Sequence, residues 1–183
     1  MRQGCRYNAR SLFLGAVLRT LGFHWGVFGV VALLVSAVLR LSPLVAELRF
    51  HSLSTLQWVV LVGFGIYMLY AEGIKGFHRN FSPRVVARAY HLREHSLPLL
   101  ALFAPLFCMG FIHATKKRRL TSILVTSGIV VLVLLVRLLP QPWRGIIDCG
   151  VVAGLVTGIA SLLWFWARAV FLRQPPAVAL DLP

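Results

Sequence analysis

Acidic residues are scarce in this chain of 183 residues, which has 5 Asp and Glu against 19 Lys and Arg and a formal net charge of +14. General acid–base catalysis draws on carboxyl groups, so few candidates for that chemistry exist. The sequence also contains no serine–histidine–aspartate set, no glycine-rich nucleotide-binding loop and no paired carboxylates. These absences favour a non-enzymatic protein without a cofactor.

Cysteine is sparse as well. Cys5, Cys108 and Cys149 are an odd number, and their spacing matches neither a metal site nor a disulfide framework. Cys108 and Cys149 lie in apolar stretches, where cysteine behaves as a small hydrophobic residue. A disulfide-stabilised secreted fold is therefore not expected.

Apolar residues, by contrast, make up 58% of the chain, and only 13% of its residues are charged. Soluble domains of this size have about 25% charged residues, and they cannot hide so much apolar surface. The apolar residues also occur in long blocks. We therefore expect an all-α integral membrane protein, a helical bundle whose solvent is lipid.

Basic residues gather between the apolar blocks, as in the positive flanks of membrane spans. The expected partners are the bilayer and its anionic headgroups, and nucleic acid is not expected. Four firm spans are predicted at about residues 20–39, 56–71, 120–139 and 146–167. They follow a basic leader, residues 1–19, and precede a short tail, residues 168–183. The whole bundle would cover residues 20–167, with an amphipathic interfacial helix at about 83–95, its arginines reaching to headgroups.

Residues 97–114 form a further apolar segment, interrupted by Pro105 and Gly110. A full crossing would make it a fifth span and would put the run Lys116–Arg119 outside, against the positive-inside bias. A re-entrant or interfacial path would keep that run inside. We favour the second arrangement, with four spans and both termini in the cytoplasm.

Polar residues that fall near span ends are the candidates for function. Glu72, Lys75, Arg79 and Arg84 lie in a charged stretch after the second predicted span, where Glu72 has the spacing to pair with Lys75 or Arg79. This stretch could bind a partner, or it could be a turn with interface anchors. Asp148 lies inside the last predicted span, and Arg144 precedes it by one helical turn. An ion pair at the helix start is the expected role, although charges within a span can also mark an ion path.

Glycines spaced one turn apart suggest close helix contacts. Gly150, Gly154 and Gly158 share one face of the last predicted span, and Gly22 and Gly26 repeat the spacing in the first. Small residues let helices approach closely in lipid. This glycine face could pack within the chain or could join a second copy or another membrane protein.

A metal site has only a weak candidate. His91, Glu94 and His95 match the H-x-x-E-H pattern of a zinc-protease helix, but no glutamate follows residue 95 to complete the ligand set. His24 and His113 stand alone near span ends, so haem ligation is not expected.

Three segments, Glu72–Arg84, Ala104–Gly110 and Pro142–Gly150, resemble a family of small uncharacterised bacterial membrane proteins. The resemblance covers about residues 55–165. It implies a bacterial inner-membrane location and carries no catalytic residue. The expected function is a scaffold or assembly component of a membrane complex. The alternatives are a small transporter or channel using Asp148 and Glu72, and, less favoured, a membrane metalloenzyme.

Overall fold

The computed structural model describes the backbone of residues 3–50, 52–94 and 102–180. Within these ranges, side chains are described except at residues 3–16, 18, 19, 50, 94 and 118. The described elements are, in chain order, α1 (Gln3–Ala46), the 3-10 helix η1 (Glu47–Phe50), α2 (Thr55–Met68), the π-helix η2 (Leu69–Phe81), α3 (Ser82–Glu94), α5 (Ala104–Cys108), α6 (Lys116–Val136) and α7 (Trp143–Phe171). No strand occurs in these ranges, so the prediction of an all-α fold is confirmed.

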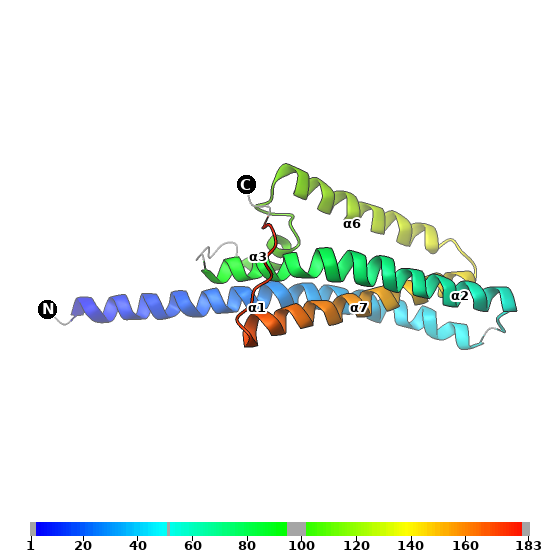
Figure 1. Ribbon diagram of the computed structural model, residues 1–183, viewed down its shortest axis with the longest axis horizontal. Helices are drawn as coiled ribbons and strands as arrows, with labels where there is room; N and C mark the ends of the chain where they lie inside the picture. The colour runs from blue at the N-terminus through cyan, green and yellow to red at the C-terminus, as the bar shows by residue number, and fades with distance from the viewer. Residues whose placement is uncertain (1–2, 51, 95–101, 181–183) are drawn as a thin grey trace.

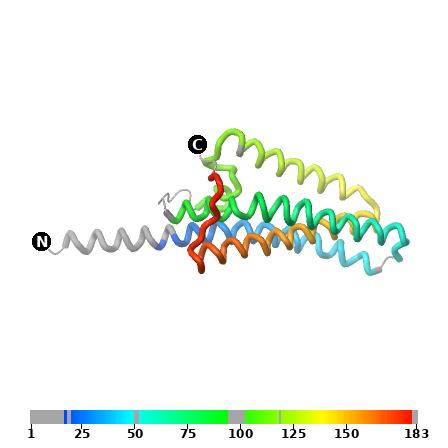
Figure 2. Tube along the Cα trace, viewed as in Figure 1, coloured from blue at the N-terminus to red at the C-terminus, as the bar shows by residue number. Residues whose placement is uncertain are grey.

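Four helical stretches in the described ranges are long and apolar enough to cross a membrane. They are Thr20–Arg49, Thr55–Arg93, Arg119–Val136 and Trp143–Phe171. α1, α2, α3 and α7 pack along one another, while α6 stands apart from them (Figure 1). The same arrangement is visible in the trace of Figure 2. The chain is therefore a helical bundle of a membrane protein.

The second long stretch is one continuous helix, because α2, η2 and α3 follow each other without a loop. It begins at a capping box, in which Ser54 accepts from the backbone of Gln57 and the Gln57 side chain accepts from the backbone of Ser54. The helix expected at about 83–95 is therefore not a separate one, because Ser82 continues the helix before it. The Ser82 backbone is helical, and its N–H donates to the carbonyl of Phe77, five residues earlier.

The described part of the segment 97–114 is α5 and the turn that follows it. A helix of 5 residues is far shorter than the roughly 20 residues that a span requires. Pro105 lies in its first turn, and Gly110 ends it in the left-handed conformation with φ 84°. α3 ends and α6 begins at the same end of the bundle (Figure 1), so the chain returns to that end instead of crossing.

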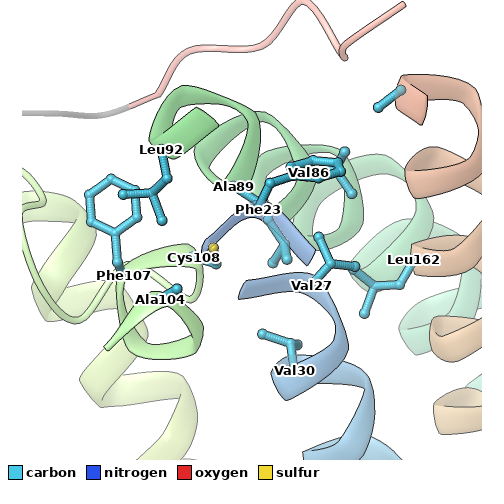
Figure 3. Close-up of a cluster of buried hydrophobic side chains, with 12 residues drawn as sticks. Phe23, Val27, Val30, Val86, Ala89, Leu92, Ala104, Phe107, Cys108 and Leu162 are labelled. Carbon is cyan, nitrogen blue, oxygen red and sulfur yellow. The ribbon is translucent and has the colours of Figure 1, made fainter. Parts of the chain in front are cut away.

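The core lies where α1, α3, α5 and α7 meet (Figure 3). Its fully buried side chains include Phe23 and Val27 of α1, Ala89 of α3 and Leu162 of α7. Glycines of α1 admit α5, because a methyl group on Gly26 would lie 2.8 Å from the sulfur of Cys108, and one on Gly29 would clash with the Pro105 ring. Gly22 is buried too. Small residues therefore set the closest contact of this core.

Candidate functional site

The glycine face of α7 is occupied by the chain itself. A methyl group on Gly150 would lie 2.6 Å from the Phe64 ring, and one on Gly158 would lie 2.6 Å from the Phe77 ring. On Gly154 it would lie 2.6 Å from Glu72 Oε2. Of the two readings of these glycines, packing within the chain is the one that the structure shows. It places η2 directly against α7.

η2 lies beside the middle of α7. Glu72 contacts Gly154 and Phe77 contacts Gly158, and both glycines are central in the 29 residues of α7. Arg144 and Arg168 flank the apolar part of α7 and lie about 36 Å apart along a helix that rises 1.5 Å per residue. The hydrocarbon core of a bilayer is about 30 Å thick. The beginning of the charged stretch that the sequence placed after a span is thus level with the middle of α7, and its later residues lie nearer to Arg168.

The wide turns of η2 give it two different faces. A π-helix bonds each N–H to the carbonyl five residues earlier, and such segments are frequent at functional sites. Gly73 is buried and faces Thr157 of α7, where an added methyl group would lie 2.9 Å from Thr157 Cγ2. Lys75, Arg79 and Asn80 are exposed. We call these the inner face and the outer face of η2.

Glu72 is the central group of the inner face. Its Oε2 is enclosed and has no hydrogen-bond partner. The space for it exists because Gly154 has no side chain. Further along the same seam, Nδ1 of His78 lies 3.1 Å from Oγ of Ser161, and the His78 ring packs on Phe165. The inner face therefore combines an unpaired carboxyl oxygen with one histidine–serine contact.

The outer face carries basic side chains without ion pairs in the described part of the chain. Lys75 and Arg79 have no salt bridge there, and Asn80 donates from Nδ2 to the carbonyl of Lys75 at 2.6 Å. The expectation that Glu72 pairs with Lys75 or Arg79 is wrong, because Glu72 is turned toward α7 and the two cations are turned away from it. Arg84, at the start of α3, is half-buried.

Asp148 and Arg144 form the ion pair that their spacing predicted. Nε of Arg144 lies 3.8 Å from Oδ2 of Asp148, which is too long for a hydrogen bond. Asp148 is only 5% exposed. The pair lies in the first turns of α7, where the helix dipole also favours an anion. Asp148 therefore has a local partner, whereas Glu72 has none that the structure describes.

Arg88 is the functional group that the sequence reasoning missed. It was expected to reach lipid headgroups, but it is only 2% exposed, so that expectation is wrong. Its Nε donates to the carbonyl of Phe107 at 2.7 Å, and its guanidinium lies over the Phe107 ring at 4.4 Å. Nη2 donates to the carbonyls of Ile112 and His113, and Nη1 to that of Leu180.

Through these bonds Arg88 of α3 connects the end of α5, the turn before α6 and the C-terminal tail. We call this set of contacts the Arg88 clasp. His113, whose carbonyl Arg88 binds, has the unusual φ of 49°. A pattern could have found it: Arg88 lies on the same helical stripe as the buried Val85 and Leu92. A polar residue within an apolar stripe needs a partner inside the protein.

Cys108 lies on α5, directly after Phe107, whose carbonyl Arg88 binds. It is buried against Gly26 of α1 and is 1% exposed. Burial raises the pKa of its thiol to about 12, and the nearby Arg88 guanidinium opposes that shift only in part. Since the thiolate is the reactive form, Cys108 is an inert packing residue at neutral pH.

Of the three weak metal candidates, only His91 has a described side chain. His91 is half-buried, while the side chain of Glu94 and all of His95 lie outside the described residues. Among the residues described, no three His, Cys, Asp or Glu side chains lie close enough to hold a metal ion. His24, considered above for haem, accepts the indole N–H of Trp166 at 3.2 Å.

No protein-family model, curated protein or solved structure matches this chain. The resemblance noted for the segments 72–84, 104–110 and 142–150 stays a prediction. Function is therefore argued from the geometry of η2 and its neighbours.

Proposed function

We propose that this chain is a multi-pass protein of a bacterial inner membrane and acts, without catalysis, as a scaffold or assembly component of a membrane complex. One observation carries the proposal: the outer face of η2 exposes Lys75 level with the centre of α7, and exposes Arg79 four residues further along the same helix. A cation at the centre of a span raises the free energy of insertion by about 2.5–3.5 kcal/mol. Such residues usually face protein or water, so a covering partner explains them.

The distribution of the other basic residues supports a cytoplasmic N-terminus. The end of the bundle where α3 ends, α6 begins and α7 ends (Figure 1) carries the run Lys116–Arg119 together with Arg93, Arg168 and Arg173. The opposite end carries only Arg40, Arg49, Arg137 and Arg144. The positive-inside rule puts the more basic end in the cytoplasm, and both chain termini with it.

The test is purification of the tagged full-length chain from its native membrane in mild detergent, after chemical crosslinking. A scaffold co-purifies with a membrane protein in constant proportion, and the double variant Lys75→Met, Arg79→Met loses that protein. The matched control, Lys116→Met with Lys117→Met, removes two cations at the end of the span and keeps the complex. A monodisperse monomer from the unchanged chain refutes the proposal.

A second candidate, a small transporter or channel, is favoured by the inner face. The enclosed, unpaired Oε2 of Glu72 is a candidate ligand for a proton or a small cation within the span. Asp148, the other acid proposed for this role, is held by Arg144. In proteoliposomes, Glu72→Gln would abolish ion or proton flux while Glu47→Gln, at the end of the bundle, would not. Equal flux through both variants removes this candidate.

A further inference from the structure

We propose that the outer face of η2 binds a transmembrane helix of a partner protein through an acidic side chain in the middle of that helix. The inference rests on the proposed function and names the chemistry of the partner. Its residues are Lys75, Arg79 and Asn80. Lys75 and Arg79 lie nearly one π-turn apart and therefore point to the same side, as their shared exposure shows.

Depth decides that Lys75 needs a counter-charge within the membrane. It lies between Gly73, which faces Thr157, and Phe77, which contacts Gly158, near the midpoint between Arg144 and Arg168 of α7. From the midpoint each edge of the hydrocarbon core is about 15 Å away, half of its thickness of about 30 Å. A lysine side chain is shorter than that, so anionic lipid heads do not meet Lys75 at this depth. Arg79 follows His78, which contacts Ser161, about 10 Å before Arg168, and is therefore closer to one edge.

The chain itself offers no suitable acid among its described residues. Glu72 is on the inner face against Gly154, and Asp148 is paired with Arg144 near the start of α7. Glu47 lies at the end of the bundle, in η1. α6, the helix that packs least, has no acidic residue at all. A second copy of the chain brings the same three acids among the side chains that the structure describes, so a different protein is the partner that we propose.

A carboxylate in a neighbouring span matches this face chemically. Arginine donates two parallel N–H bonds to a carboxylate, and lysine adds a point charge to the same group. Asn80 uses its Nδ2 on the backbone of Lys75, which leaves its side-chain oxygen as an acceptor for the partner's polar atoms. In hydrocarbon such a pair also removes the cost of leaving either charge alone.

The experiment places the purified full-length chain in nanodiscs of phosphatidylcholine with a labelled polyleucine transmembrane peptide. The peptide carries Asp, Asn or Leu at its centre, and energy transfer measures binding. The Asp peptide binds about tenfold more tightly than the Leu peptide, the scale expected of one polar contact between helices. The Lys75→Met, Arg79→Met variant removes this preference, and the Lys116→Met, Lys117→Met control keeps it.

Three results overturn the inference: equal binding of the Asp and Leu peptides, loss of the preference when phosphatidylglycerol is added, or self-association that depends on Lys75 and Arg79. The second result assigns the face to anionic lipid, and the third to another copy of the chain. If the chain prefers the Asp peptide but no protein co-purifies with it from native membranes, the scaffold function is refuted and the inferred binding chemistry of the outer face stands. A native partner without an acidic residue in its span refutes the inference and leaves the function.

Discussion

α6 and α7 are both long, apolar helices, yet only α7 is packed inside the bundle. α7 contacts α1, α2, η2 and α3, whereas the described side chains of α6 are exposed except at Ser122 and Val136. Glycines mark the difference: four of α7 are close to other helices, while Gly128 of α6 has nothing within 4 Å. Lipid tails are as apolar as leucine, so apolar residues bring a helix into the bilayer and small residues decide where it packs.

Polar contacts hold α6 at its ends instead. Ser122 donates to the carbonyl of Met109 at 3.0 Å, and Arg88 binds the carbonyls of Ile112 and His113 just before the helix begins. At the other end, Gln141 donates to Glu47 Oε2 at 3.0 Å. α7 is therefore held by close packing at its glycines, whereas α6 is held by hydrogen bonds at its ends. Substitutions in either region test this difference.

The largest effect is expected at Arg88. Arg88→Met leaves four buried or partly buried carbonyls without their donor, which should cost about 3 kcal/mol or more of unfolding free energy. Arg93→Met, on the same helix but exposed, is the matched control and should change stability little. Thermal unfolding in detergent measures both, and trypsin should cut the run Lys116–Arg119 faster in Arg88→Met. Equal melting of the two variants would contradict the clasp.

A smaller effect is expected where α7 meets η2. Gly158→Leu puts a side chain into the Phe77 ring and should cost about 1–3 kcal/mol by overpacking. Gly128→Leu makes the same change on α6 in open space, and its melting temperature should equal that of the unchanged chain. If Gly128→Leu destabilised the protein as much as Gly158→Leu does, α6 would have to be packed like α7.

The smallest effect is expected at Cys108, where the measured quantity is the rate of thiol labelling and the stability of the protein does not change. In the variant Cys5→Ser, Cys149→Ser, maleimide should label Cys108 very slowly from pH 7 to pH 9, because its pKa of about 12 keeps the neutral thiol throughout this range. Ser52→Cys in a chain that also lacks Cys108 should react within minutes and more rapidly as the pH rises. The reaction is measured in the folded protein and again after denaturation in SDS. Rapid labelling of Cys108 before denaturation would show that the reagent reaches the core beside α6.

Much of the architecture could be read from the sequence, because spans depend on composition over many residues. The four apolar blocks and the all-α class follow from that alone. The pair Arg144–Asp148 was also predictable, since both residues lie on one helix at a fixed spacing. Glycine spacing showed that a helix would approach α7 closely, but not which one, because spacing on one helix carries no information about its neighbour.

The charged stretch after residue 71 shows where sequence reasoning failed. Its composition suggested either a partner-binding stretch or a turn with interface anchors at the end of a span, but the helix continues through it as a π-helix. Contacts with Gly154 and Gly158 hold it in place, and these come from a segment far along the chain. Arg88 was missed for a related reason: its acceptors are backbone carbonyls of distant segments, and every sequence has carbonyls.

The sequence by itself determined that this protein is helical and enters lipid, because hydrocarbon accepts only long apolar segments whose backbone groups are bonded internally. Only the tertiary structure decided which side of each helix is polar and to what depth. In the folded bundle Glu72 faces α7, Lys75 and Arg79 are exposed on the surface of η2, and Arg88 is buried in the core. Those choices depend on close contacts between helices, and such contacts exist only once the bundle has formed.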